Sequence, residues 1–187
     1  MKSKNSSVNQ ITEGVIWKQL LLFFFPILLG TLFQQLYNTA DAIVVGRFVG
    51  KEALAAVGGS SGQIVGLVVG FFVGLSSGAT VIIARFYGAR NERDLNRALH
   101  TAAALAIVGS IIITILGVIF TPAMLRLMNT PEDVMAGSVI YLRVYFSGIL
   151  FVFIYNIGSA VLRAIGDSKR PLYFLIVCCF INIVLDI

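Results

Sequence analysis

Long apolar stretches separated by short charged segments dominate the pattern along this chain. Residues 19–40, 53–84, 101–125, 144–162 and 171–185 contain no Asp, Glu, Lys or Arg. A helix of roughly 20 residues crosses the hydrocarbon core of a bilayer, and the first four stretches are long enough for this. The pattern predicts an all-α integral membrane protein with five transmembrane helices, at about 18–46, 56–84, 99–120, 139–164 and 171–187.

The fifth helix is truncated because the chain stops inside it. The sequence ends VLDI within an apolar segment, without a loop or a basic flank. We therefore interpret the chain as a fragment, with a transmembrane lobe at 18–187 that is incomplete at its C-terminus. Residues 1–17 are polar and lack the apolar core and cleavage site of a signal peptide. We expect them to form a cytoplasmic segment that precedes the first span.

The charge of the chain is low in amount and uneven in distribution. Only 12% of its residues are charged and 58% are hydrophobic, whereas about 25% of the residues of soluble domains are charged. The positive-inside rule places the N-terminus in the cytoplasm, and we expect a multi-pass protein of the plasma membrane. The net charge of +5 then follows from topology, with no nucleic-acid partner. One side carries Lys2, Lys4, Lys18, Arg85, Arg90, Arg93, Arg97, Arg163, Lys169 and Arg170, and the other carries Arg47, Lys51, Arg126 and Arg143.

A carboxylate lies near the end of the first span, where charged groups are costly. Asp41 closes the uncharged run 19–40, and four apolar residues follow it. Ionisable residues inside a membrane are candidates for functional sites. Gln34, Tyr37 and Asn38 precede Asp41 at helical spacing, so one face of the helix is expected to carry all four. The alternative is that Asp41 is a helix-end residue exposed at the outer interface.

Two later spans carry polar residues of the same kind. Asn182 and Asp186 lie four residues apart in the last apolar stretch. Two acids with amide neighbours in separate spans suggest a site for a proton or a cation. In the fourth span, Tyr155 and Asn156 either line an interior cavity or form hydrogen bonds between helices.

A proline and a row of glycines indicate how the helices bend and pack. Pro26 lies inside the first span, where it usually kinks a helix. The kink either fits the neighbouring helices or acts as a hinge for gating. Small residues let helices approach closely in lipid, so we expect a packing surface on the second span, with a sliding surface as the alternative. Its glycines recur every fourth residue, at Gly62, Gly66, Gly70, Gly74 and Gly78.

Sequence motifs for catalysis and for ATP hydrolysis are absent. The chain has no Walker-type loop, no nucleophile elbow and no zinc motif. Cys178 and Cys179 are adjacent within a span, and we expect them to be packing residues and not a metal site. We therefore expect no enzyme, no cofactor and no metal other than a coupling sodium ion. An ion gradient, or a missing part of the protein, would supply the energy.

Several segments, which extend over nearly the whole chain, form a recognisable pattern: Leu32–Asp41, Val45–Arg47, Ala53–Gly58, Tyr141–Arg143, Leu162–Ala164, Gly166–Lys169, Pro171, and Asn182 with Asp186. In order and spacing they resemble the multidrug and toxic compound extrusion (MATE) family. The resemblance implies a twelve-helix transporter with two six-helix lobes around a central cavity, and this chain supplies most of the N-terminal lobe. It also implies export of organic cations, drugs or metabolites in exchange for protons or sodium.

The same resemblance assigns roles to residues. It implies that Asp41, Asn182 and Asp186 form the ion site of the N-terminal lobe, and that Gln34 and Tyr37 line the cavity. If the two acids meet, they would titrate as a coupled pair. A proton or sodium ion would neutralise the site, let the first span repack and release a cationic substrate. The expected partners are this small molecule, membrane lipid and the missing C-terminal lobe.

Two alternative functions are considered beside drug efflux. A lipid-linked oligosaccharide flippase of the same superfamily would share the architecture, but it should have a more cationic cavity for the anionic pyrophosphate. The spans of this chain offer acids and few buried basic residues. A non-transporting membrane scaffold would use the glycine row as an oligomer interface, and both acids would then tolerate replacement.

Overall fold

The computed structural model describes residues 15–186, and at Asp186 it describes the backbone alone. The described residues are almost entirely helical, which confirms the predicted all-α class. Most of the predicted cytoplasmic segment 1–17 and the side chain of Asp186 lie outside the described part. In chain order the elements are α1 (Ile16–Val44), the π-helical segment η1 (Val45–Val49), α2 (Lys51–Gly58), α3 (Ser60–Gly88), α4 (Glu92–Leu127), α5 (Glu132–Ala164) and α6 (Lys169–Asp186).

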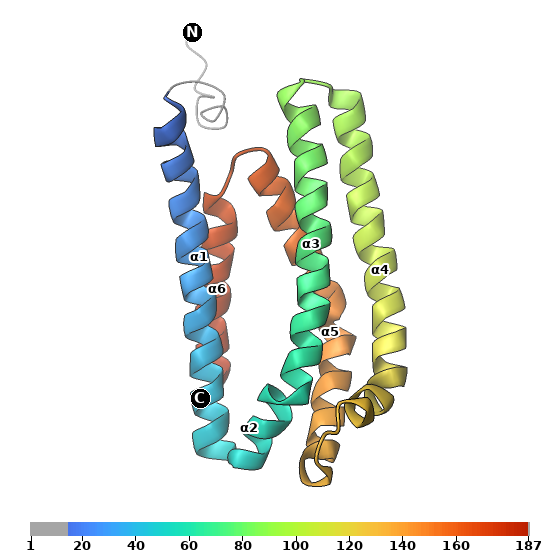
Figure 1. Cartoon of the computed structure of the whole chain (residues 1–187). Coiled ribbons are helices and arrows are strands. Elements are labelled where there is room, and N and C mark those ends of the chain that lie inside the picture. Colours follow the sequence, from blue (N-terminus) through green and yellow to red (C-terminus); the bar gives the residue numbers. More distant parts are fainter. Residues whose placement is uncertain (1–14, 187) are drawn as a thin grey trace.

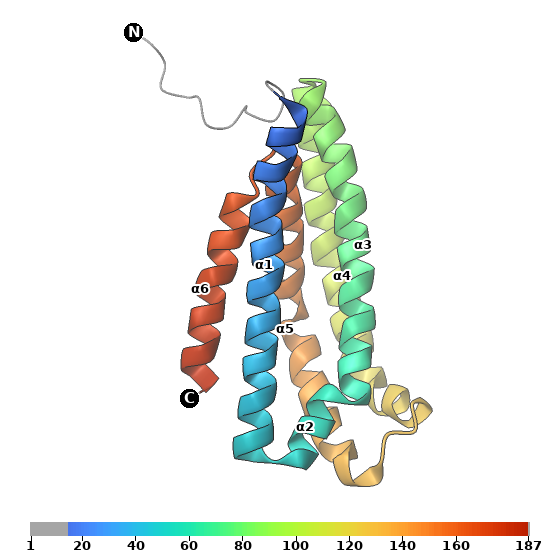
Figure 2. The ribbon, with the colours of Figure 1, turned by 60° about the vertical axis from the view of Figure 1, so that its left-hand side comes forward.

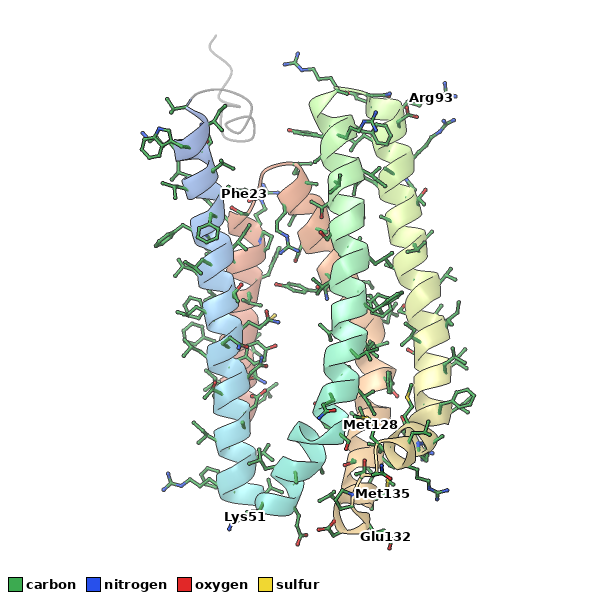
Figure 3. All side chains as sticks on the ribbon, viewed as in Figure 1. Phe23, Lys51, Arg93, Met128, Glu132 and Met135 are labelled. Carbon is green, nitrogen blue, oxygen red and sulfur yellow. The ribbon has the colours of Figure 1, made fainter. Side chains whose placement is uncertain are left out.

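The long helices run side by side and form two groups. α1 lies along α6, and α3, α4 and α5 pack together as a bundle (Figures 1 and 2). The short α2 leads from the end of α1 to α3 and packs against α5. The start of α1 and the α3–α4 turn lie at one end of the molecule, which also carries Arg93, while Lys51 and Glu132 lie at the opposite end (Figure 3). Consecutive long helices therefore alternate in direction, as membrane spans do.

Four segments of the described chain are long and apolar enough to cross a membrane. They are Ile16–Val49, Lys51–Gly88, Glu92–Leu127 and Glu132–Ala164. The fifth predicted span is present as α6, but this helix has only 18 residues and is not among the four. The chain is therefore a multi-pass membrane protein.

The second span differs from its prediction as a single helix over 56–84, because the chain turns sharply at Gly59 between α2 and α3. A Cβ at Gly59 would lie 2.6 Å from the carbonyl oxygen of Ala55, so the turn requires glycine. Gly50, with a φ of +118°, lies between η1 and α2 and redirects the chain there. Gly50 and Gly59 thus bound the short helix α2 on its two sides, and Gly59 separates it from α3.

The third span is longer than the predicted 99–120, because α4 covers Glu92–Leu127. At its start, the Asn91 side chain accepts a hydrogen bond from the backbone N–H of Asp94 at 3.2 Å and caps the helix. Near its end, the helix continues through Pro122. A proline removes one backbone donor and does not always end a helix.

The core lies between α3, α4 and α5, where large apolar side chains are buried. Phe72 of α3 packs edge-on against Phe153 of α5. A Cβ added to Gly117 of α4 would overlap the ring of Phe146, so this glycine lets α4 and α5 meet closely. α1 has no buried residue among those described. The buried cluster consists of Ile64, Phe72, Ala102, Ala106, Leu125, Leu142, Phe146, Ile149, Phe153 and Ile157.

Hydroxyl groups add polar links between these helices. Thr114 Oγ1 of α4 donates to the carbonyl oxygen of Phe146 in α5 at 3.0 Å. Ser138 Oγ of α5 donates to the carbonyl oxygen of Ala56 in α2 at 3.2 Å. Polar groups within a membrane need internal partners. These two bonds satisfy the hydroxyls and fix the positions of α4 and α2 on α5.

Candidate functional site

The predicted polar face of α1 is present near the end that leads into η1. Tyr37 and Asp41 are half-buried, whereas Gln34 and Asn38 are exposed. The Tyr37 side chain forms a hydrogen bond with Gln34 and lies within electrostatic range of Asp41. Asn38 instead donates to the side chain of Gln35, on its own helix, at 3.4 Å. The structure thus brings three of the four predicted residues together.

Tyrosines from α5 complete this group across the space between α1 and α5. Tyr141 lies within electrostatic range of both Asp41 and Tyr37, and Tyr155 lies within range of Tyr37. Tyr145 lies within range of Tyr37, and its ring centroid is 6.3 Å from that of Tyr141. We call Tyr37, Asp41, Tyr141, Tyr145 and Tyr155 the tyrosine–aspartate cluster. Asp41 lies within range of Tyr37 and Tyr141, and Tyr37 links this carboxylate to Tyr145 and Tyr155.

Tyr141 and Tyr145 were not among the residues predicted for this site, although their spacing carries a signal. Tyr145 follows Tyr141 by about one helical turn. Tyr155 follows Tyr141 by 14 residues, or about four turns of 3.6 residues. One face of α5 therefore presents all three tyrosines. The spacing identifies the face, but only the packing of the helices shows that this face lies toward Asp41.

α6 brings Asn182 toward the same region. Cys178, one turn before Asn182, lies within electrostatic range of Tyr37, and α6 packs along α1. The Oδ1 atom of Asn182 is shielded from solvent and accepts no hydrogen bond from the described residues. A buried amide oxygen without a donor is a suitable ligand for a cation. The side chain of Asp186 is outside the described residues, so its contact with Asp41 stays a prediction.

Two other predicted positions have simpler surroundings. The Nδ2 atom of Asn156 donates to the carbonyl oxygen of Val152 at 2.8 Å, within α5 itself. A short amide side chain readily reaches the carbonyl four residues earlier, so this bond does not link two helices. Pro26 lies inside α1, and the helix continues through it. Its role as a hinge therefore stays a prediction.

The glycine row of α3 has no close neighbour along most of its length in the described chain. Gly62 is the exception, because an added Cβ would lie 3.3 Å from the carbonyl oxygen of Val57. The buried contacts of α3 use another face, which carries Phe72. The close packing predicted for the row is thus absent between the described helices beyond Gly62. A Cβ added to any of the last four glycines would meet no atom within 4 Å: Gly66, Gly70, Gly74 and Gly78.

The chemistry of the tyrosine–aspartate cluster suits a cation. It contains a carboxylate and no basic residue. Tyrosine rings attract organic cations, and a carboxylate at membrane depth requires a partner or a proton. The described residues contain no group of three or more His, Cys, Asp or Glu that could hold a metal ion. The cluster can bind a proton, a monovalent ion or an organic cation through its oxygens and rings.

Comparison with known proteins agrees with this arrangement. The family model MatE matches residues 26–187. The probable multidrug resistance protein YoeA of Bacillus subtilis (strain 168) is 37% identical over 170 residues, which cover 91% of this chain and 36% of that protein. The probable multidrug resistance protein YpnP of the same organism is 36% identical over 174 residues, which cover 93% of this chain and 39% of that protein. The chain thus spans less than two fifths of the length of these relatives.

Solved structures give the same result for the fold. A crystal structure of MATE in complex with MaD3S is 28% identical, with a TM-score of 0.89 over 98% of this chain and 41% of that one. Crystal structures of MATE in the straight and the bent conformation match with TM-scores of 0.88 and 0.86, at 28% and 29% identity, over 98% of this chain and 40% of each. The family resemblance of the sequence is confirmed, and the chain belongs to the MatE family of transporters.

Proposed function

We propose that this chain forms part of an antiporter that exports organic cations in exchange for protons or sodium. The observation that carries the proposal is the tyrosine–aspartate cluster, which places a carboxylate among tyrosines on otherwise apolar helices. Membership of the MatE family and the multidrug resistance names of the relatives support efflux of small molecules.

Neutralisation of Asp41 is the proposed coupling step. In its charged form, the carboxylate attracts a cationic substrate toward the tyrosine rings. A proton or a sodium ion that arrives from outside neutralises Asp41 and removes this attraction, so the substrate leaves. Asn182 supplies a further oxygen ligand through its free Oδ1 atom, and Asp186 supplies a second carboxylate. Gln34 holds the Tyr37 side chain by a hydrogen bond and lines the cavity.

α1 is the element that moves in this proposal. It packs mainly along α6 and has no buried residue among those described, so its displacement costs little packing. Pro26 lacks a backbone donor and weakens the helix near its middle. We infer that α1 bends at Pro26 when Asp41 is neutralised. Solved structures of similar transporters have been described in a straight and in a bent conformation.

The complete activity requires more protein than the described helices. Because the chain spans less than two fifths of its relatives, we propose that a second lobe closes the cavity opposite the tyrosine–aspartate cluster. We also propose a plasma-membrane location with the N-terminus in the cytoplasm. The reason is that more basic residues lie at the end with the start of α1 than at the opposite end.

The alternative functions have less support. A flippase for a lipid-linked oligosaccharide must hold an anionic pyrophosphate, and the tyrosine–aspartate cluster has an acid and no base. The relatives are named for multidrug resistance, which does not favour this alternative. A scaffold without transport would have no need for a carboxylate at membrane depth.

A chimera tests the proposed function. This chain replaces the matching segment of the Bacillus subtilis relative that is 37% identical, and efflux of ethidium, a fluorescent organic cation, is followed from vesicles. An imposed proton gradient and an imposed sodium gradient are compared separately. A fluorescent anion of similar size is the matched substrate control.

We expect ethidium to be exported under one of the two gradients, which identifies the coupling ion, and the anion not to be exported. The unaltered relative shows that the vesicles are competent. A chimera that reaches the membrane but exports nothing, beside an active relative, would contradict the proposal. Export of the anion in preference to ethidium would favour a flippase-like function.

A further inference from the structure

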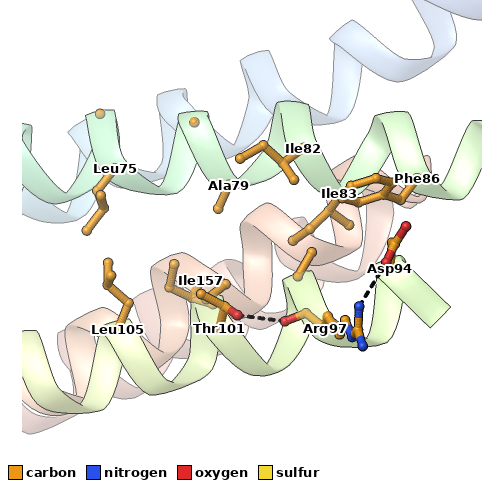
Figure 4. A pocket seen from close by; sticks show the side chains of 14 residues that line it. Leu75, Ala79, Ile82, Ile83, Phe86, Asp94, Arg97, Thr101, Leu105 and Ile157 are labelled. Carbon is orange, nitrogen blue, oxygen red and sulfur yellow. Dashed lines mark hydrogen bonds and ion pairs between the residues drawn. The ribbon is translucent and has the colours of Figure 1, made fainter. Parts of the chain in front are cut away.

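A groove lies between α3 and α4 (Figure 4). It reaches Phe86 and Asp94, close to the turn between the two helices. Its volume is about 530 Å³. One wall extends from Gly74 to Phe86 on α3, the other from Asp94 to Leu105 on α4, and Ile157 of α5 also contributes. The lining is apolar except for Asp94, Arg97 and Thr101. The groove is separate from the tyrosine–aspartate cluster, since the two share no residue.

Small residues keep this groove open. Gly74 and Gly78 line it from α3, and Ala98 and Ala102 line it from α4. A Cβ added to Gly74 or Gly78 would meet no atom within 4 Å, so the protein leaves the space beside them empty. An empty apolar space loses dispersion contacts on its lining. In a membrane, the adjacent lipid chains are the nearest material that can fill it.

The length of the groove fits one acyl chain. From Gly74 to Phe86 there are 12 helical steps, which correspond to about 18 Å, and from Asp94 to Leu105 there are 11 steps, which correspond to about 17 Å. The hydrocarbon core of a bilayer is about 30 Å thick, so one leaflet contributes about 15 Å. The groove therefore extends from one membrane surface to about the midplane.

Positive charge is concentrated at the end of the groove near the α3–α4 turn. Residues 85–97 contain four arginines and two acids, a net charge of +2. Arg97 lines the groove, and its side chain is 66% exposed. Asp94 pairs with Arg97 at 3.6 Å (Figure 4), but exposed pairs of this kind contribute little. Arg97 therefore keeps donors for a phosphate, and an arginine can bind phosphate through two parallel hydrogen bonds.

We propose that the groove binds one acyl chain of an anionic phospholipid, whose phosphate contacts Arg97. The apolar walls take the chain, and the arginines of the α3–α4 turn favour an anionic headgroup over a zwitterionic one. The bound lipid fills the space between α3 and α4 and so stabilises their packing. The proposal rests on the shape and charge of the groove and is independent of the transport mechanism.

The first test compares two lipids on the unaltered chain. The protein is purified in detergent, and bound lipid is counted by native mass spectrometry during titration with phosphatidylglycerol or with phosphatidylcholine of the same acyl chains. We expect one phosphatidylglycerol to bind at least about fivefold more tightly, since each basic residue near an anionic headgroup contributes about 1 kcal/mol. Equal affinity for the two lipids would overturn the proposal.

The second test fills the groove. Gly74→Leu with Gly78→Leu places two side chains in the empty space, and Gly66→Leu with Gly70→Leu is the matched control on the same helix, outside the groove. We expect the groove variant to lose phosphatidylglycerol binding by at least tenfold and the control to keep it. Equal binding by both variants would show that the lipid lies elsewhere.

The third test changes the charge at the groove and does not depend on how the leucine variants fold. Arg97→Gln should weaken phosphatidylglycerol binding about fivefold and leave phosphatidylcholine binding unchanged. Arg126→Gln, at the other end of α4, should change neither. Equal effects of Arg97→Gln and Arg126→Gln on phosphatidylglycerol binding would show that the phosphate does not contact Arg97. Displacement of the lipid by tetraphenylphosphonium would instead identify the groove as a site for organic cations.

Discussion

Replacement of Gly117 by alanine tests how α4 and α5 are held together. Gly117 is buried in α4, and a Cβ added there would overlap the ring of Phe146. Phe146 is 1% exposed within the core, so its ring has no free space to enter. Gly70 in α3 is the matched control, because it is exposed inside a helix and an added Cβ would meet no atom within 4 Å.

The expected magnitude follows from the difference between the two sites. Both substitutions gain about 1 kcal/mol in helix propensity, and this gain cancels in the comparison. The remaining effect is overpacking against Phe146, which typically costs about 1–3 kcal/mol. We therefore expect the free energy of unfolding of Gly117→Ala to be lower than that of Gly70→Ala by about 1–3 kcal/mol.

The assay is unfolding in mixed micelles with increasing dodecyl sulfate, where pulse proteolysis measures the unfolded fraction. Phe146→Leu in the Gly117→Ala background should recover part of the loss, because the two residues are in contact and their effects are not additive. Equal stability of Gly117→Ala and Gly70→Ala would show that Phe146 leaves room for a side chain at Gly117. Full additivity of the Gly117 and Phe146 substitutions would show that the two residues do not act on each other.

Two further predictions concern hydrogen bonds of single side chains. Ser138→Ala removes the bond to the carbonyl oxygen of Ala56 at 3.2 Å and should lower stability in mixed micelles by about 0.6 kcal/mol. The hydroxyl of Ser147 donates to the carbonyl oxygen of Arg143 within α5, so Ser147→Ala should leave stability unchanged. Equal losses of stability in the two variants would show that the Ser138 hydrogen bond does not hold α2 on α5. Asp167→Ala removes the acceptor for the backbone N–H groups of the first two residues of α6, at 3.2 and 3.1 Å. Hydrogen exchange of these two amides should accelerate about fivefold, because a helix cap contributes about 1 kcal/mol. Unchanged exchange would show that Asp167 does not cap α6.

The helices were predictable from the sequence because charge-free stretches of sufficient length have few alternatives to a membrane span. The residues at which the helices begin and end were less predictable. Hydropathy is continuous across Gly59, and the turn there depends on the close approach of its backbone to Ala55. Similarly, the third span was predicted to end at residue 120, but α4 continues through Pro122 to Leu127. Local backbone geometry, which hydropathy does not encode, decided both cases.

The candidate site was predictable within one helix and not between helices. The spacing of Gln34, Tyr37 and Asp41 placed them on one face of α1, because helical periodicity alone determines that relation. The approach of Tyr141 and Tyr145 to this face depends on how α1 and α5 are arranged. For the same reason, the glycine spacing predicted a surface of small residues but not the neighbour of that surface.

Removal of the charge of Asp41 tests whether this residue couples ion movement to efflux. Asp41→Asn is compared with Asp133→Asn, an exposed acid at the start of α5, in the chimera with the Bacillus subtilis relative. Ethidium efflux and the accompanying ion flux are measured at equal amounts of protein in the membrane. We expect Asp41→Asn to lose gradient-driven efflux and Asp133→Asn to keep it. Undiminished coupled efflux in Asp41→Asn would show that Asp41 does not couple ion movement to efflux.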